Sequence, residues 1–307
     1  DHRDLHSFPT RRSSDLRLGA AIGAPPDALA LKGQDWGIPP QDPQALAAAQ
    51  FRPFSRLMRD NMRHFGAVRL DHVMALQRQW WVPQGLPATQ GGYVQYPLDD
   101  LLAIVAAESQ RSRCLVIGED LGTVPDQMRM AMAAWGVYHY KVLLFEQTPR
   151  GAFIPPQDWS RRALATVTTH DLPTLASWWA GSDIELRARL GLYPDAATQE
   201  EVEPGRARDR ERLLDAPAEA GRRPPGPVDR FEPHFAGAVH AFLAATRSAL
   251  VAVQAEDLLG MLEPVNVPGT STEHANWQRK LAGDLEALFE GPAPAPLLQA
   301  LRQHRPR

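Results

Sequence analysis

The stretch CLVIGED, residues 114–120, is an apolar run that ends in two carboxylates. Two other stretches share this design: AVRLDH at residues 67–72 and LATVTTHD at residues 164–171. A buried strand carries ionised groups at low cost only at its end, where water or a polar site receives them. Three such ends in order predict parallel strands whose carboxyl ends meet at one cleft, the arrangement by which a (β/α)8 barrel builds its active site.

The residues around these stretches alternate between helix and strand patterns. Helical spacing of apolar residues predicts helices at residues 44–65, 97–109, 125–135 and 233–257, with two further helix-like segments at 276–290 and 295–304. Apolar runs of strand type predict strands at residues 67–74, 114–119, 140–146, 163–169 and 258–262. Residues 17–42 are rich in Ala, Gly and Pro and are predicted to be loop. The alternation favours an α/β fold with a parallel sheet.

Five strands are fewer than the eight of a complete barrel. The pattern therefore leaves two options open: a smaller doubly wound sheet, or an incomplete (β/α)8 barrel of TIM type without its first strands. Residues 183–232 are dominated by charges and prolines, which predicts a surface insertion that begins with a helical pair. Residues 1–16 show no initiator Met and no clear period, so we expect a non-native leader there and exclude it from the fold of residues 17–307.

Composition excludes several classes of protein. The chain has 307 residues, of which 44% are hydrophobic, enough for a sizeable core. A net charge of -3 provides no basic field for nucleic acid, and no apolar run approaches the roughly 18 residues of a membrane span. The one cysteine, Cys114, rules out a disulfide within the chain, so we expect a reducing compartment, the cytoplasm.

The first candidate pair is Arg69 and Asp71. Residues two apart on a strand share a face, so the guanidinium is expected beside the carboxylate, where it favours the ionised form. An ionised, oriented Asp in a cleft can act as a nucleophile. A purely structural ion pair remains the alternative.

The second candidate is Glu119, which follows Gly118 at the end of an apolar strand. Burial and the neighbouring charge of Asp120 would both raise the pKa of Glu119, which suits a general acid. The alternative is a solvated loop in which Asp120 caps a helix that begins near Pro125.

The third candidate is the dipeptide His170-Asp171, which ends another strand and can hydrogen-bond to substrate hydroxyls; a capping role for Asp171 before Pro173 is equally compatible. Paired Asp and Glu at a cleft is the requirement of glycoside chemistry.

Aromatic residues also favour a sugar-binding site, because Trp36, Trp80 and Trp81 lie in or near loop-like stretches and Trp faces can stack on sugar rings. Packing in a core or interface is the other explanation for them.

Taken together, these motifs resemble the amylomaltases, the bacterial 4-α-glucanotransferases. The matching stretches, in chain order, are GQDWG at 33–37, RLDHVM at 69–74, GEDLG at 118–122, THDLPT at 169–174, NVPGT at 266–270 and NW at 276–277. The resemblance covers roughly residues 17–290. Arg-x-Asp and the acidic Glu recur in the wider α-amylase clan, whereas His directly after the Asp is typical of the amylomaltases.

The resemblance implies a role for each matching residue. Asp71 would be the nucleophile and Glu119 the acid/base, while Asp171 and His170 would hold sugar hydroxyls. Arg69 would support Asp71, and the remaining substrate-binding residues would be Trp36, His72 and Asn266. The family begins with a further long segment that supplies the first barrel strands, so we expect this chain to be a fragment.

The implied reaction moves an α-1,4-glucan segment from a donor to an acceptor by a retaining double displacement, with maltooligosaccharides as partners and without metal or cofactor. An α-amylase-like hydrolase with the same three carboxylates stays open, as does an inactive starch-binding remnant. A metal-dependent phosphohydrolase built on His64, His72, His170 and Asp171 is disfavoured, because these residues lack a close ligand pair on a helix.

Overall fold

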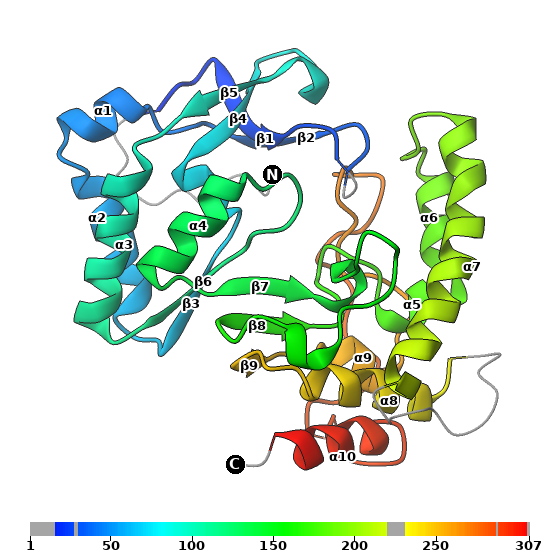
Figure 1. The fold of residues 1–307 in the computed structure, drawn as a ribbon. Helices are drawn as coiled ribbons and strands as arrows, with labels where there is room; N and C mark the ends of the chain where they lie inside the picture. The colour runs from blue at the N-terminus through cyan, green and yellow to red at the C-terminus, as the bar shows by residue number, and fades with distance from the viewer. Residues whose placement is uncertain (1–15, 28–29, 220–230, 287, 306–307) are drawn as a thin grey trace. The chain divides into compact units, whose positions relative to one another are not determined.

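The computed structural model describes residues 16–27, 30–219, 231–286 and 288–305 (Figure 1). The chain divides into two compact units, Asp1–His139 and Tyr140–Arg307, and each is described by itself. Both units combine helices with strands, so the predicted α/β class is confirmed. The predicted leader lies outside the described residues except for Leu16, and so do residues 220–230 of the predicted insertion.

The first unit contains a four-stranded sheet that the sequence did not reveal. Its strands run in the order β2-β1-β4-β5 with antiparallel neighbours, and their bounds are Ala20–Ala24 (β1), Gln34–Ile38 (β2), Arg78–Pro83 (β4) and Gly92–Gln95 (β5). The prediction of loop for residues 17–42 is therefore wrong. The composition of residues 17–42 was misleading because a small residue there allows two strands to pair closely. A Cβ on Gly23 would lie 2.0 Å from the main-chain oxygen of Gln34.

A parallel pair of strands forms the second sheet of this unit. Strand β3 (Ala67–Leu70) pairs with β6 (Leu115–Gly118), in register from Ala67 opposite Leu115 to Leu70 opposite Gly118. Both strands were predicted, but the first one ends earlier than residue 74. His72 takes a left-handed conformation with φ of 44°, and a 3-10 helix at Val73–Leu76 follows it. The loop that carries Asp71 therefore starts directly after the paired residues.

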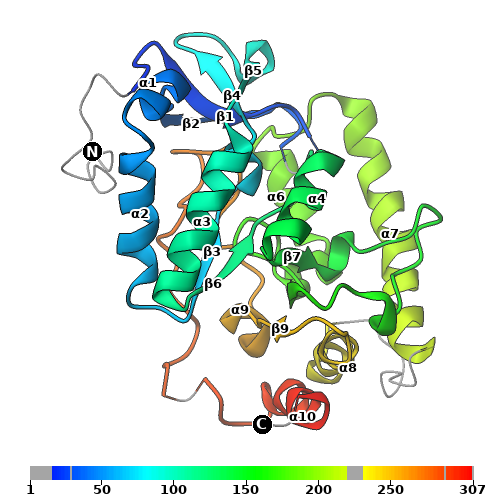
Figure 2. The same ribbon diagram turned by 60° about the vertical axis from the view of Figure 1, so that its left-hand side comes forward.

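Four helices accompany this parallel pair: α1 (Pro43–Ala48), α2 (Arg52–Met62), α3 (Leu98–Ser112) and α4 (Asp126–Trp135). The last two confirm their predictions. The single helix predicted at 44–65 is wrong, because Gln50 and Phe51 adopt positive φ and break it into α1 and α2. Figures 1 and 2 show α2 and α3 side by side. Their apolar faces bury Met62, Leu102 and Val105 in one core with residues of β6.

The second unit is built around a sheet of order β7-β8-β9, whose strands are His139–Val142, Ala163–Thr166 and Leu250–Val251. Strands β8 and β9 pair in parallel. The strands predicted at 140–146 and 163–169 are confirmed at their starts and are shorter than expected. The strand predicted at 258–262 is wrong, because helix α9 (Ala255–Leu259) occupies that position and ends at Gly260, which has φ of 63°.

The helices of this unit are α5 (Leu175–Ala180), α6 (Ser182–Arg189), α7 (Ala196–Glu219), α8 (Pro233–Ala244) and α10 (Ala295–His304), in addition to α9. The helical pair expected at the start of the insertion is confirmed as α6 and α7. The helix predicted at 233–257 is too long, because α8 stops at residue 244 and β9 follows. In the described residues of 276–290 no helix forms, so that expectation is wrong, whereas the one at 295–304 is confirmed.

Short apolar segments explain these errors, since periodicity alone does not separate a two-residue strand from a helix end. Helix α10 packs against α8 in Figures 1 and 2, and the apolar core of the unit gathers Phe235, Val239, Leu243 and the two tryptophans Trp178 and Trp179. Among the described helices, none is both long enough and apolar enough to cross a membrane.

Candidate functional site

Asp71 and Glu119 follow the ends of β3 and β6, and the backbone continues to pair beyond the strands. The N–H of Glu119 donates to the main-chain oxygen of Leu70 over 2.8 Å, and the N–H of Val73 donates to the main-chain oxygen of Glu119 over 2.9 Å. Because the two strands are parallel and in register, their carboxyl ends lie at one edge of the sheet. The two predicted carboxylates therefore come together in the first unit.

Glu119 is buried, with 8% of its surface exposed, and both of its carboxyl oxygens are held by the backbone. Oε1 accepts a hydrogen bond from the N–H of Leu121, and Oε2 accepts one from the N–H of His72, each over 2.7 Å. Burial raises the pKa of Glu119 to about 7, and the nearby charge of Asp71 adds to the rise, although the two N–H bonds oppose it. A carboxyl with this pKa can both donate and accept a proton near neutral pH.

Gly118, which precedes Glu119, has a packing role. A Cβ at this position would lie 2.9 Å from side-chain carbons of both Val73 and Met132. The absence of a side chain allows β6 to approach the 3-10 helix that follows Asp71. This contact draws the loops that carry Asp71 and Glu119 together.

Asp71 contrasts with Glu119 because its side chain is 74% exposed. Oδ1 of Asp71 lies 2.6 Å from an Nη nitrogen of Arg69, so the ion pair expected from their spacing on the strand is present. Asp71 is thus exposed and paired with a guanidinium. Glu119 is buried, and its raised pKa leaves it partly protonated near neutral pH.

His72 and Trp36 complete this part of the site. Their rings meet edge to face with centroids 5.3 Å apart, and β2 supplies Trp36. The left-handed backbone of His72 is uncommon for a residue with a side chain, and such strain gathers at functional sites. Burial lowers the pKa of His72, so its imidazole is neutral at pH 7.

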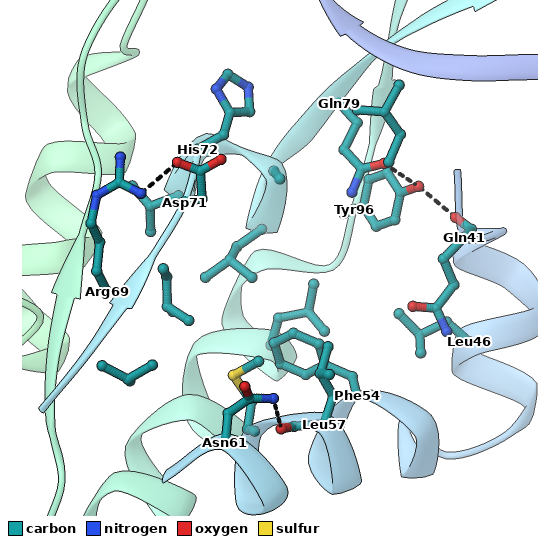
Figure 3. A pocket seen from close by; sticks show the side chains of 18 of the residues that line it. Gln41, Leu46, Phe54, Leu57, Asn61, Arg69, Asp71, His72, Gln79 and Tyr96 are labelled. Carbon is teal, nitrogen blue, oxygen red and sulfur yellow. Dashed lines mark hydrogen bonds and ion pairs between the residues drawn. The ribbon is translucent and has the colours of Figure 1, made fainter. Parts of the chain in front are cut away.

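A pocket of about 370 Å³ opens beside Asp71 and lies within the first unit (Figure 3). Arg69, Asp71 and His72 form one end of it, and apolar side chains of α2 such as Phe54 and Leu57 form the other. The pocket is also lined by a hydrogen-bonded chain in which the Tyr96 hydroxyl lies 2.5 Å from the main-chain oxygen of Gln41 and 2.9 Å from Oε1 of Gln79. The sequence analysis missed this chain, since nothing in the spacing of these three residues links them.

The other predicted residues lie in the second unit, after strand β8. Nε2 of His170 lies 3.0 Å from Oδ2 of Asp171, and Nδ2 of Asn266 donates to Oδ1 of Asp171 over 2.6 Å. This contact joins residues 95 positions apart, both of which the resemblance had assigned to the site without predicting that they touch. The ring of Trp277 lies 5.3 Å from that of His170 and is 63% exposed, an aromatic that the motifs contained but to which no role was given.

Asp71 and Glu119 belong to one unit and Asp171 to the other, so the convergence of all three stays a prediction. The capping role considered for Asp171 is filled by Thr174 instead, whose hydroxyl accepts the N–H of Ser177 at the start of α5. Asp120 does not cap α4 either. Its Oδ2 lies 2.8 Å from Nδ1 of His139 instead. In the part of the chain that the structure describes, no group of three or more His, Cys, Asp or Glu could hold a metal ion.

Comparison with known proteins identifies relatives of one kind. The family described as 4-alpha-glucanotransferase, glycoside hydrolase family 77, matches residues 10–286. A 4-alpha-glucanotransferase of Haemophilus influenzae is 40% identical over 289 residues, which are 90% of this chain and 40% of the relative. One from Mycobacterium tuberculosis is 39% identical over 300 residues, covering 94% of this chain and 41% of the relative. The chain thus spans about 40% of the length of these relatives.

Solved structures agree with this result. The crystal structure of an amylomaltase from Corynebacterium glutamicum superposes with a TM-score of 0.83 at 32% identity, over 92% of this chain and 42% of the other. An amylomaltase from Streptococcus agalactiae, solved in complex with acarbose, has the same fold with a TM-score of 0.72 at 19% identity, over 96% of this chain and 52% of the other. With a family match over most of its length, the chain belongs to the 4-alpha-glucanotransferases of glycoside hydrolase family 77.

Proposed function

We propose that this chain carries the catalytic carboxylates of a retaining 4-α-glucanotransferase. The observation that carries the proposal is the pair Asp71 and Glu119 at the ends of two adjoining parallel strands, one open to solvent and one buried with its pKa raised to about 7. A retaining transfer requires these two functions: an ionised nucleophile, and an acid that becomes a base in the second step.

In the first step Asp71 attacks the anomeric carbon of an α-1,4-linked glucan. The glycosidic bond breaks, and Glu119 gives its proton to the leaving oxygen. In the second step the 4-hydroxyl of an acceptor sugar loses its proton to Glu119 and attacks the glucosyl ester, which frees Asp71. Two displacements restore the α-configuration, and the carboxyl groups of a retaining enzyme stand about 5 Å apart. The pair needs no cofactor for this chemistry.

The remaining predicted residues bind and position the sugar. Arg69 holds Asp71 through their ion pair, and the neutral imidazole of His72 and the ring of Trp36 offer a polar edge and a stacking face beside it. Asp171, held by His170 and Asn266, would accept hydrogen bonds from hydroxyls of the distorted sugar. The acarbose complex of the streptococcal amylomaltase supports maltooligosaccharides and other α-1,4-glucans as the substrates.

The fold of residues 17–307 is proposed to be the C-terminal part of a (β/α)8 barrel, with residues 183–232 as a surface insertion. The support is the parallel pairing of β3 with β6 and of β8 with β9, together with the coverage of about 40% of the relatives. Cytoplasmic localisation is supported by the single, buried Cys114. The net charge of -3 gives no reason to expect nucleic acid as a partner.

The test is disproportionation of maltotriose by the protein in the longest form that its gene encodes. Glucose together with maltotetraose and longer products is expected, because sugar rather than water receives the glucan. Release of glucose and maltose alone would identify an α-amylase-like hydrolase. Binding of maltotriose without any product would identify a starch-binding remnant.

A further inference from the structure

Helix α9 and the residues around it hold both ends of the loop that presents His170 and Asp171. Before the loop, the hydroxyl of Thr168 donates to Oε1 of Gln254. After it, the hydroxyl of Thr174 donates to the main-chain oxygen of Met261 over 2.5 Å. The position of the loop in the second unit therefore depends on where α9 lies.

Asp257 of α9 makes the central attachment. It is 3% exposed, and its Oδ1 accepts the N–H of Leu175 over 3.0 Å. Leu175 is the first residue of α5, and its N–H is one of the donors that a helix start leaves without an internal partner. Asp257 therefore fixes the start of α5, four residues after Asp171.

The second oxygen of Asp257 faces a buried histidine of α8. Oδ2 of Asp257 lies 3.7 Å from Nε2 of His240, and both side chains are at most 1% exposed. Among the described residues neither atom has a hydrogen-bond partner. Nδ1 of His240 lies 2.8 Å from the main-chain oxygen of Ala236, so it must carry a proton to donate there. In a neutral imidazole, Nε2 is then an acceptor that points at another acceptor.

A single proton resolves this conflict. With no proton between them, a carboxylate oxygen and a nitrogen lone pair face each other in a dry core, at a cost. Placing the proton on Oδ2 of Asp257 turns the carboxyl into a donor toward His240 and leaves both groups uncharged. Placing it on the imidazole would create two buried charges, for which desolvation is costly.

We infer that Asp257 is a positioning residue that stays protonated where it faces His240 and that anchors the loop carrying His170 and Asp171. This inference rests on the proposed function for its catalytic meaning, since that function makes Asp171 a sugar-binding group. Asp257 touches neither the sugar nor the reacting atoms. It acts through the N–H of Leu175 and through the attachment of α9 to α8.

The charges around the pair agree with a neutral carboxyl. Burial raises the pKa of Asp257 to about 7, and the negative charge of Glu256 adds to the rise. Burial lowers the pKa of His240 to about 4. Arg279 pairs with Glu256, since an Nη nitrogen of Arg279 lies 2.8 Å from Oε1 of Glu256. Helix α8 thus presents the neutral imidazole of His240 to Oδ2, α9 adds the like charge of Glu256, and the start of α5 bonds the other oxygen through the N–H of Leu175.

The sign of the pH effect follows from the raised pKa. A carboxyl whose pKa in the folded state lies above its unfolded value contributes stability below the unfolded pKa, and this stability is lost as pH rises through the folded value. We therefore expect the wild-type protein to lose thermal stability between about pH 4 and pH 8 relative to Asp257→Asn. The amide of Asn has the shape of the neutral carboxyl: its oxygen can accept the N–H of Leu175, its NH2 can face Nε2 of His240, and it does not titrate.

The experiment compares Asp257→Asn, Asp257→Leu and wild type in the longest form that the gene encodes. Asp257→Asn is expected to keep kcat for maltotriose within about threefold of wild type, and Asp257→Leu to lower kcat by about tenfold or more with KM changed less. Asp183→Asn is the control, because Asp183 is also a buried aspartate of the second unit but pairs with Arg206. Asp183→Asn should lower Tm, because it breaks that ion pair, whereas Asp257→Asn should retain the native contacts.

Three outcomes would overturn the inference: Asp257→Asn as damaging as Asp257→Leu, Asp257→Leu with unchanged kcat, or Tm curves of wild type and Asp257→Asn that stay parallel across pH. Because Glu119 also titrates near pH 7, Tm rather than activity is the pH readout. If Asp257→Leu does not fold, the Tm curves of the other two proteins decide. If wild type shows no transfer, the proposed function fails, while the Tm comparison still tests the proton.

Discussion

The main-chain N–H of His72 donates a hydrogen bond to Oε2 of Glu119 over 2.7 Å, so the residue after one candidate carboxylate holds the other. His72 itself has φ of 44° and ψ of 61°, and the N–H of the next residue, Val73, donates to the main-chain oxygen of Glu119. These hydrogen bonds fix the main-chain separation of Asp71 from Glu119, while the exposed Asp71 side chain is held by Arg69. A retaining mechanism depends on that separation.

Removal of either carboxylate is the first prediction. Asp71→Ala deletes the nucleophile and Glu119→Gln deletes the proton, so each is expected to lower maltotriose disproportionation by about 10³-fold or more. Asp126→Asn serves as the control, because the Asp126 side chain is 95% exposed on α4. Product analysis by chromatography gives the rates. Near wild-type rates from either carboxylate variant would refute the assignment.

The second prediction concerns pH. Glu119 must be protonated to act as the acid, and its pKa is raised to about 7 by burial. The value of kcat/KM for maltotriose should therefore be highest below about pH 7 and fall by about tenfold per pH unit above it. A profile measured from pH 5 to pH 9 checks this. A kcat/KM that stays level up to about pH 9 would exclude Glu119 as the general acid.

The local sequence pattern predicted those features of the site that lie at the end of a single strand. Arg69 beside Asp71, and Glu119 at the end of an apolar strand, follow from the two-residue period and from the cost of burying charge. The structure confirms the ion pair of Arg69 with Asp71 and the burial of Glu119. Nothing local could show that the N–H of His72 would donate to Glu119, because the two residues lie 47 positions apart in the chain.

The errors in the fold have the same origin. Strand β1 is made mostly of small residues that composition assigns to loops, yet it pairs with β2 because Gly23 permits close approach to Gln34. Strand β9 has two residues, too few for any period to show. Long amphipathic helices such as α3 were predicted well because fifteen residues repeat one pattern.

His72 provides the third prediction. In the left-handed region a side chain costs about 1 kcal/mol relative to glycine, so His72→Gly should be more stable than His72→Ala by about that amount. Urea unfolding of the two variants measures the difference, and both lose the ring contact with Trp36 equally. Ala75→Gly, in the 3-10 helix that follows, should instead destabilise the protein. A less stable His72→Gly would show that backbone strain is absent there.

Arg305 provides the fourth prediction. Its guanidinium donates to the main-chain oxygens of Ala244, Thr246 and Ser248, each over 2.7 Å, at the carboxyl end of α8. These carbonyls have few other donors at a helix end, and a cation there also interacts favourably with the helix dipole. Arg305→Ala is expected to cost about 2–4 kcal/mol in the free energy of unfolding. The neighbouring exposed Arg302→Ala should cost less than about 0.5 kcal/mol, and equal losses would contradict the capping role.

Glu108 provides the last prediction. Its buried carboxylate accepts hydrogen bonds from Arg59, Arg111 and Ser55, and these partners, Arg59 first, lower the pKa of Glu108 to about 2 despite its burial. A depressed pKa contributes stability that is present above the unfolded value of about 4.5 and lost as pH falls toward about 2. Glu108→Gln should therefore lower stability by about 1–3 kcal/mol at pH 7 and by roughly half as much at pH 3, because wild type has lost more than half of this contribution there. Asp100→Asn, an exposed change on the same helix, should show no such convergence in denaturant unfolding at the two pH values. If the Glu108→Gln and wild-type curves stay equally far apart at both, the carboxylate does not depend on its arginines.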